Sequence, residues 1–111
     1  MEKPSDFYCN FAISGKADIK KVYESDKVIA FHHTHPAYEK HIVIVPKEHI
    51  TDLIALKESH NETLLEIVEV AKKLANEFNL EKEGVRLITN MGIYQDSKHL
   101  HFHLVSGERM K

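Results

Sequence analysis

Histidine and apolar residues alternate without a break along residues 99–105, which read His-Leu-His-Phe-His-Leu-Val. In a helix His99 and His103 would share one face, while His101 would lie on another. In a strand all three imidazoles share one face, and the apolar residues between them form the opposite face, which suits a core. The alternation therefore predicts a strand that presents a row of imidazoles about 6.5–7 Å apart.

Four further stretches predict strands, because apolar and β-branched residues alternate or cluster there between polar turns. Ser25-Asp26 is typical of a tight turn between the first two of them. His41 is followed by four β-branched residues and then Pro46, a run that is typical of a strand buried on both faces. The predicted strands cover residues 20–24, 27–33, 41–45 and 85–89.

A long helix is predicted to begin at Ser59, because Ser59 and Glu62 have the spacing of a capping box. Its apolar stripe is expected at every third or fourth position, with a solvated charged side opposite. A brief helix is also predicted over residues 6–14, capped by Asp6, and another after Thr51. The expected stripe of the long helix comprises Leu64, Leu65, Ile67, Val68, Ala71, Leu74, Ala75 and Phe78.

These elements predict an α+β fold with about five antiparallel strands, one long helix inserted after the third strand, and one or two short helices. The long helix is expected to pack on the apolar face of the sheet. The chain has 111 residues, with neither internal repeats nor a low-complexity linker. Residues 1–111 are therefore expected to form a single domain.

Charge and cysteine content exclude several classes of function. The formal net charge is −2 and no basic run is present, which argues against a duplex nucleic-acid partner. The single cysteine, Cys9, excludes an internal disulfide and is compatible with a reducing compartment. Residues 1–6 lack an apolar signal core, and no stretch is long enough to span a bilayer. We therefore expect a cytoplasmic protein that binds neither nucleic acid nor membranes.

Nine histidines place most of the candidate chemistry on imidazole rings. A neutral imidazole, whose unperturbed pKa is about 6.5, offers one lone pair, so the row can supply a nucleophile, a proton donor or metal ligands. A solvated histidine stripe is the alternative interpretation. His41 joins the same pocket if its strand neighbours the row, whereas His35 and His60 are expected at the surface.

The His-x-His-x-His row followed by Leu104-Val105 resembles the signature of the histidine triad (HIT) family. Residues 21–31 resemble that family's first hairpin, and residues 41–50 resemble its next strand with the turn after it. The tail over residues 104–109 looks like the HINT-like branch of the family. Since the similarities cover most of the chain, it is identified by resemblance as a member.

The resemblance implies a homodimer whose two sheets join into one, and an enzyme that cleaves a bond at the α-phosphorus of a purine nucleotide. It implies that His101 forms a covalent nucleotidyl-histidine, a role that requires its ring to face an open hollow of nucleotide size. A nucleoside phosphoramidase is the expected activity and a dinucleoside polyphosphate hydrolase the alternative, with no cofactor required. The implied catalytic residues are His41, His99, His101 and His103, and the implied nucleotide-binding residues are Phe31, His32, His33, Asn90, Gln95 and Ser97.

Two departures from the family's pattern bear on this site. Where the family usually has an aspartate that contacts the ribose hydroxyls, this chain has His33. The loop before the row normally reads Gly-Gln-Ser or Gly-Gln-Thr, whereas here it reads Tyr94-Gln95-Asp96 and is about two residues shorter. Asp96 brings a negative charge that repels phosphate unless the side chain turns away. A nucleotide-binding module with weakened catalysis is therefore a further alternative.

Many bacterial members of the family carry a zinc site of two cysteines and two histidines, and the resemblance implies a matching set here. That set is Asp6, Cys9, His49 and His99, in which one cysteine is replaced by a carboxylate that can still bind zinc. The alternative, which we favour, makes Cys9 a small buried hydrophobe. A metal-binding module built on the histidines remains an alternative function.

Overall fold

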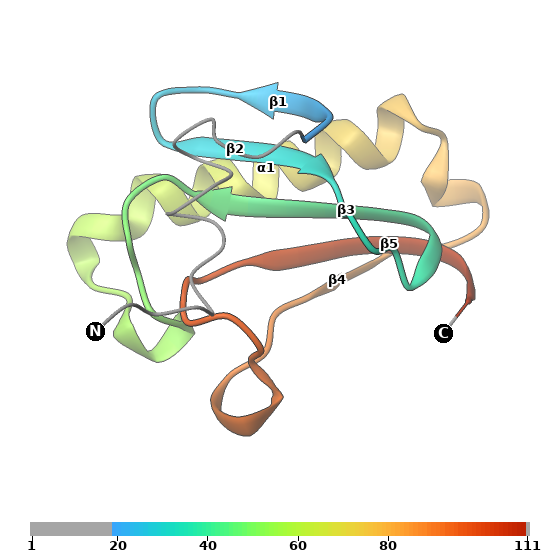
Figure 1. Ribbon diagram of the computed structural model, residues 1–111. Helices are drawn as coiled ribbons and strands as arrows, with labels where there is room; N and C mark the ends of the chain where they lie inside the picture. Colours follow the sequence, from blue (N-terminus) through green and yellow to red (C-terminus); the bar gives the residue numbers. More distant parts are fainter. Residues whose placement is uncertain (1–18, 111) are drawn as a thin grey trace.

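The computed structural model describes residues 19–110, and its strands form a five-stranded sheet in which all neighbouring pairs are antiparallel. The strand order is β1-β2-β3-β5-β4, so β3 lies at the centre, between β2 and β5 (Figure 1). The brief helix expected over residues 6–14 lies outside the described residues. The strands are β1 Lys21–Glu24, β2 Val28–His32, β3 Tyr38–Pro46, β4 Arg86–Ile88 and β5 Phe102–Arg109.

The helix α1, Asn61–Glu77, crosses one face of the sheet and packs against β2 and β3 (Figure 1). This confirms the predicted α+β fold, with its long helix on an apolar face of the sheet. In the part of the chain that the structure describes, no helix is both long and apolar enough to cross a membrane. Within residues 19–110 there are also four single-turn 3-10 helices: η2 Leu53–Ala55, η3 Glu58–His60, η4 Leu80–Lys82 and η5 Gly92–Tyr94.

Strand β3 is buried on both faces, as its unbroken apolar run predicts. Ile42 and Ile44 belong to the core cluster under α1, whereas Val43 and Val45 belong to a second cluster on the opposite face. The apolar residues of the histidine row join the first cluster, as the alternation predicts. They are Leu100, Phe102 and Leu104.

The register between β3 and β5 places two histidines on the face opposite α1. His103 pairs with Val43, and His41 pairs with Val105, so both rings share the face of the second cluster. Because β2 lies on the other side of β3, the residues that follow it can reach the same face.

The histidine row is a strand only from Phe102 onward, so the prediction of a strand from His99 was too long by three residues. The Leu100 N–H donates a hydrogen bond to the carbonyl of Ile50, in the loop after β3 (2.6 Å). Leu100 therefore bonds to that loop in place of a neighbouring strand, and the side chains of residues 99–101 need not follow the alternation of β5.

The start of α1 differs from the predicted capping box. His60 occupies the cap position, and Ser59 lies inside η3. The His60 ring is buried: its Nδ1 accepts a hydrogen bond from the Lys57 N–H (3.0 Å), and its Nε2–H donates to the Glu48 carboxylate (3.1 Å). These contacts set the helix start, and the expectation of a surface position for His60 was wrong.

The buried stripe of α1 is rotated from the predicted one, because Leu65 and Val68 are exposed. Glu66 on α1 accepts hydrogen bonds from the hydroxyl groups of Tyr23 (2.8 Å) and Ser25 (2.5 Å) and so ties α1 to the first hairpin. The buried residues of α1 are Thr63, Ile67, Val70, Ala71 and Leu74.

The short helix expected after Thr51 is the single turn η2, and Asp52 caps it in place of Thr51. The Asp52 carboxylate accepts a hydrogen bond from the Ala55 N–H (3.1 Å). Aspartate is at least as good a cap as threonine, so the turn begins one residue later.

Candidate functional site

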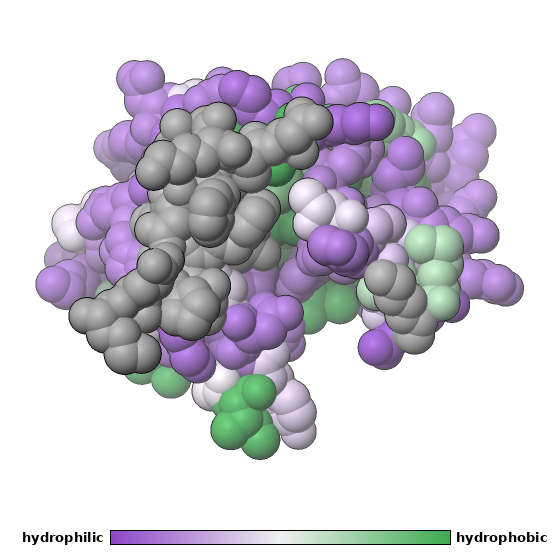
Figure 2. Space-filling model, in the orientation of Figure 1, coloured by the Kyte–Doolittle hydropathy of each residue, from purple (hydrophilic) through white to green (hydrophobic). Residues whose placement is uncertain are grey.

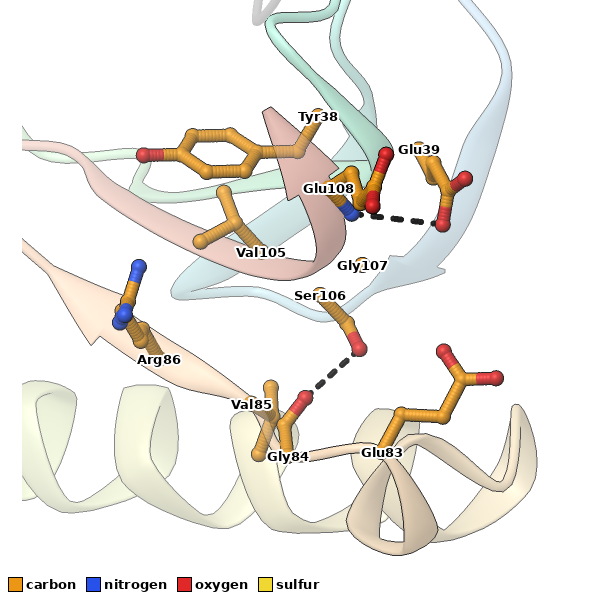
Figure 3. Close-up of a pocket in the computed structure, with 10 residues that line it drawn as sticks. All are labelled: Tyr38, Glu39, Glu83, Gly84, Val85, Arg86, Val105, Ser106, Gly107 and Glu108. Carbon is orange, nitrogen blue, oxygen red and sulfur yellow. Dashed lines mark hydrogen bonds between the residues drawn. The ribbon is translucent and has the colours of Figure 1, made fainter. Parts of the chain in front are cut away.

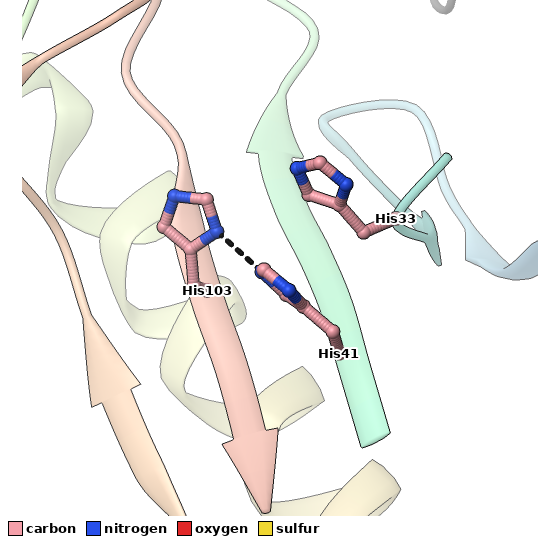
Figure 4. Close-up of side chains that lie close together, drawn as sticks. All are labelled: His33, His41 and His103. Carbon is pink, nitrogen blue, oxygen red and sulfur yellow. Dashed lines mark hydrogen bonds between the residues drawn. The ribbon is translucent and has the colours of Figure 1, made fainter. Parts of the chain in front are cut away.

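Three imidazoles meet on the face of the sheet opposite α1, where β2, β3 and β5 lie side by side. The ring centroids of His41 and His103 lie 5.0 Å apart. His33 follows β2, and its N–H donates to the His41 carbonyl (2.9 Å), which helps to hold its ring centroid 4.3 Å from that of His41 (Figure 4). We call these three side chains the imidazole cluster.

Hydrogen bonds assign the proton positions in this cluster. The Ala37 N–H donates to His41 Nδ1 (3.0 Å), so the proton of the neutral His41 ring lies on Nε2. His41 Nε2–H in turn donates to His103 Nδ1 (2.8 Å; Figure 4). The neutral His103 ring therefore carries its proton on Nε2, where it can serve as a donor.

Burial keeps both rings neutral at physiological pH. It lowers the pKa of His41 to about 4, with a smaller contribution in the same direction from His33. Burial likewise lowers the pKa of His103 to about 4, and His101, His41 and His33 add to this shift while Asp96 opposes it. At neutral pH both rings are therefore uncharged, and the His103 Nε2–H is available as a neutral hydrogen-bond donor.

His101 lies next to this pair, and its ring centroid is 5.0 Å from that of His103. Its Nδ1–H donates to the carbonyl of His99 (2.7 Å). The hydroxyl of Thr89 donates to the His101 carbonyl (2.8 Å), which fixes the backbone on the other side. Because a neutral imidazole has one proton, Nε2 of His101 keeps a lone pair and can act as a nucleophile.

Asp96 stands in front of that nitrogen. Its Oδ1 lies 3.6 Å from His101 Nε2, and the side chains of His101 and Asp96 are 2% and 87% exposed. The expectation that His101 faces an open hollow was therefore wrong for this arrangement of the loop, because the carboxylate occupies the approach to Nε2. Since Asp96 is exposed, its side chain can turn into solvent.

Asp96 follows a loop that projects from the sheet at η5 (Figure 1). Apolar surface lies at the tip of this projection (Figure 2), where Ile93 is 96% exposed and Tyr94 is also exposed. The residue that blocks His101 thus lies next to a segment with little packing around its tip.

His99 is fully buried, and its ring lies beside that of His49, at 5.1 Å between centroids. Its Nε2–H donates to the carbonyl of Pro46 at the end of β3 (2.7 Å). The structure therefore leaves His101 and His103 as the adjacent rings, while His99 supports His101 through its backbone carbonyl.

A pocket of about 460 Å³ opens beside the imidazole cluster, on the β2 side of β3. Two residues predicted to bind nucleotide, His32 and His33, line it together with Ile19, Lys20 and Thr34. We call it the donor pocket, because its described polar residues can all donate hydrogen bonds and none is a carboxylate.

The other residues predicted to bind nucleotide do not line the donor pocket. Phe31 is buried in the second core cluster, and Asn90 is half-buried after β4. Gln95 and Ser97 are both buried. Gln95 Nε2–H donates to the Thr51 carbonyl (2.7 Å), and its Oε1 has no hydrogen-bond partner among the described residues. Gln95 therefore helps to hold the loop that carries Asp96.

A second pocket, of about 490 Å³, lies on the β5 side of β3 (Figure 3). We call it the carboxylate pocket, because Glu39, Glu83 and Glu108 line it and Arg86 is the only cation in its described lining. The Glu108 N–H donates to the Glu39 carboxylate (3.3 Å; Figure 3). Three carboxylates repel a phosphate, so this pocket does not suit a nucleotide.

Metal binding fits one histidine pair better than the imidazole cluster. The cluster brings three ring nitrogens within 4.8 Å of one another. However, a metal-bound imidazole usually donates its second N–H, whereas the second nitrogen of His41 accepts from the Ala37 N–H. His99 matches the usual pattern, because its Nε2–H donates to a carbonyl beside His49. The other two residues of the predicted zinc set, Asp6 and Cys9, lie outside the described residues.

Sequence reasoning missed Lys20, Ala37 and Thr89. Ala37 donates its backbone N–H to the His41 ring, and the Thr89 hydroxyl donates to the backbone carbonyl of His101. Both contacts involve a main-chain group, so no pattern of side chains in the sequence predicts them. Lys20 is the first residue of the predicted first strand, and only the position of β1 beside β2 brings it to the donor pocket.

Comparisons with known proteins agree on one family. A family model described as the scavenger mRNA decapping enzyme C-terminal binding family matches residues 6–111. The chain is 34% identical to a solved HIT family hydrolase from Clostridium thermocellum, which superposes with a TM-score of 0.85 over 97% of this chain and 95% of that one. It is 33% identical over 88 residues to the purine nucleoside phosphoramidase of Escherichia coli, covering 78% of this chain and 74% of that protein. It is 39% identical over 93 residues to a 14 kDa zinc-binding protein of Zea mays, covering 80% of this chain and 72% of that protein.

Proposed function

Because the chain belongs to the histidine triad family, we propose that it hydrolyses a bond at the α-phosphorus of a purine nucleotide through a covalent nucleotidyl-His101 intermediate. A nucleoside phosphoramidase is the activity that we favour, since the Escherichia coli relative carries that name. The observation that carries the proposal is the His101 hydrogen bond to the His99 carbonyl, which leaves the lone pair on Nε2 beside the donor of His103.

In the first step, the Nε2 lone pair of His101 attacks the α-phosphorus, a P–N bond to the ring forms, and the bond to the leaving amine breaks. The leaving nitrogen takes the bonding pair and a proton from solvent. The ring keeps its Nδ1–H, and the His99 carbonyl stabilises the positive charge that develops on it. In the second step, water attacks the phosphorus, the P–N bond breaks, its electron pair returns to Nε2, and the proton of water passes to solvent.

His103 is assigned the role of stabilising the phosphoryl oxygens. Its Nε2–H is held by the His41 bond to Nδ1, and a fixed donor costs little reorganisation as charge develops. His41 acts through His103 and is a positioning residue. Asp96 must turn away from Nε2 before a phosphorus atom can approach.

The test is to incubate the protein with adenosine phosphoramidate, quench the reaction and locate any nucleotidyl adduct by mass spectrometry. We expect the adduct on the peptide that contains His101, and no adduct and no turnover in His101→Ala. His35→Ala is the matched control, since His35 is an exposed histidine outside the donor pocket lining. An adduct on a different histidine, or no turnover of any nucleotide, would contradict the proposal.

A dinucleoside polyphosphate hydrolase would use the same intermediate with a nucleotide as the leaving group. A weakly catalytic binding module is the other alternative, and the position of Asp96 in front of Nε2 favours it. Measured nucleotide affinity with negligible turnover of both substrate types would select this alternative.

We also propose the homodimer that the family resemblance implies, with β4 as the joining edge. Strand β4 ends the sheet, its Leu87 is exposed, and the apolar tip of the η5 loop lies near it in the chain. Exposed apolar residues on a sheet edge suit pairing with a second copy. Light scattering should show a dimer, and Leu87→Lys should shift it toward monomer.

Zinc binding is a second candidate function, supported by the hydrogen bond of His99 and by the zinc-binding relative from Zea mays. In that case His99 and His49 would hold the ion, with Asp6 and Cys9 as the remaining expected ligands. Metal analysis of protein purified without a histidine tag decides the question: a trace amount contradicts it. The cytoplasmic location stays a prediction.

A further inference from the structure

The donor pocket has the chemistry of an anion site. Lys20 contributes an ammonium group, Thr34 a hydroxyl, and His32 and His33 imidazoles, whereas Ile19 is the only apolar residue of the described lining. A volume of about 460 Å³ holds a small charged group with room to spare. None of these groups is negative, so an anion that enters meets no repulsion from the lining.

Two lysines act on His32 in this pocket, Lys20 from just before β1 and Lys40 from β3. Besides the dominant effect of burial, Lys40 and Lys20 each lower the pKa of His32. The Lys40 ammonium lies 4.8 Å from the Phe78 ring centroid, which is 6.1 Å from that of His32. Two ammonium groups that disfavour a proton on the same imidazole also favour a negative charge beside it.

Among the residues that line the donor pocket, His33 has a ring whose remaining nitrogen is a hydrogen-bond donor. Its Nδ1 accepts a hydrogen bond from the His35 N–H (2.9 Å), so the neutral ring carries its proton on Nε2. A ribose diol has hydroxyl protons to give, and a carboxylate would accept them. A lining of ammonium, hydroxyl and imidazole N–H groups instead matches the oxygens of a phosphate.

The pocket lies within reach of the reacting atoms. The His33 ring centroid is 6.0 Å from that of His103, which is 5.0 Å from that of His101. The donor pocket and His101 are therefore separated by about the width of the imidazole cluster. Two phosphates on one ribose can reach both places.

We propose that the donor pocket binds a second phosphate, carried on the 2′ or 3′ oxygen of the ribose, so that the preferred substrates are ribose-phosphorylated nucleotides. The inference rests on the proposed function, which places the 5′ phosphorus at His101. The same chemistry could recognise a further phosphate of the 5′ chain, and the test separates the two sources.

The test measures, by calorimetry on the full chain, the affinities for AMP, ADP and the 2′,5′- and 3′,5′-bisphosphates of adenosine. We expect one bisphosphate to bind about tenfold or more tightly than AMP, since its second phosphate gains charge-assisted hydrogen bonds from the lining. ADP should gain less than about threefold over AMP. Lys20→Met should remove most of the bisphosphate advantage, while Lys72→Met, at an exposed position on α1, should keep it.

Each other outcome has a definite meaning. If AMP binds as tightly as both bisphosphates, the inference is overturned and the proposed function stands. If ADP gains as much as the bisphosphates, the pocket serves the 5′ chain, and the ribose assignment is wrong. An advantage that survives in Lys20→Met places the phosphate elsewhere and also overturns it. If no nucleotide binds, both the inference and the proposed function fail.

Discussion

The donor pocket and the carboxylate pocket flank the central strand β3 and have nearly equal volumes, about 460 and 490 Å³, yet they suit opposite ligands. The first presents an ammonium, a hydroxyl and two imidazoles beside the imidazole cluster. The second presents three carboxylates and one guanidinium at the far end of β5 (Figure 3). Their volumes alone do not indicate which pocket binds a ligand. Charge and the distance to a nucleophile are what distinguish a site for phosphate chemistry from a surface hollow.

The largest expected effect tests which pocket serves catalysis. His101→Ala should lower kcat/KM for adenosine phosphoramidate by about a thousandfold or more, because the covalent intermediate can no longer form. Glu83→Gln, in the carboxylate pocket, should leave it within about twofold. If the Glu83 variant is the more damaged of the two, the roles of the pockets are reversed.

The next effect is a loss of folding stability at low pH, which we expect from the buried His41 on β3. The pKa of His41 is about 4 in the fold and about 6.5 when unfolded, so below neutral pH the unfolded chain binds a proton that the folded chain does not. Stability is therefore full above about pH 6.5 and falls as the pH drops toward about 4. At about pH 5 the loss for His41 reaches up to about 2 kcal/mol.

Urea denaturation at about pH 7 and about pH 5 measures this loss. His41→Gln should show a smaller difference between the two pH values than the wild type, and Glu83→Gln should show the same difference as the wild type. An unchanged pH dependence in His41→Gln would mean that His41 titrates normally in the fold.

A third prediction concerns Asp96, whose carboxylate lies in front of His101 Nε2. Asp96→Asn keeps the shape of the side chain and removes the charge that repels phosphate 3.6 Å from His101 Nε2. We expect kcat/KM to rise by about tenfold, which corresponds to about 1.4 kcal/mol. A lower rate in this variant would instead show that the carboxylate assists the reaction.

The smallest effect is expected at the floor of the carboxylate pocket. Gly107 has a φ of +84°, and an added Cβ would lie 2.8 Å from the Cβ of Glu39 and against its carboxylate. Gly84 has a φ of +99° with nothing within 4 Å of such a Cβ, so Gly84→Ala serves as the control for backbone strain alone. Gly107→Ala should be less stable than Gly84→Ala by about 1 kcal/mol in thermal unfolding. Nucleotide affinity should not change in either variant.

The fold followed from the sequence wherever burial alone decides the structure. The β-branched run after His41 predicted a strand buried on both faces, and Ile42 and Val43 do lie in different core clusters. The start of α1 did not follow, because the buried His60 takes the cap position and its ring bonds to Glu48, which lies twelve residues earlier in the chain. Local propensity cannot weigh such contacts between segments.

The site divides in the same way. The positions of His41 and His103 on one face could be predicted from alternation and strand order. The protons on their rings could not, because the Ala37 N–H decides them. The contact between Asp96 and His101 depends on the path of a loop without periodicity, so the sequence predicted the charge but not its place.

His99 serves two neighbours through different atoms. Its ring bonds to Pro46 beside His49, while its carbonyl sets the proton on His101. The substitution His99→Asn removes the ring and its hydrogen bond to Pro46 but keeps the carbonyl that accepts from His101. It therefore separates the role of the ring from the role of the carbonyl. A main-chain oxygen thus decides which nitrogen of the His101 ring carries the proton. The side chain at position 99 can therefore change during evolution while the proton on His101 stays on Nδ1.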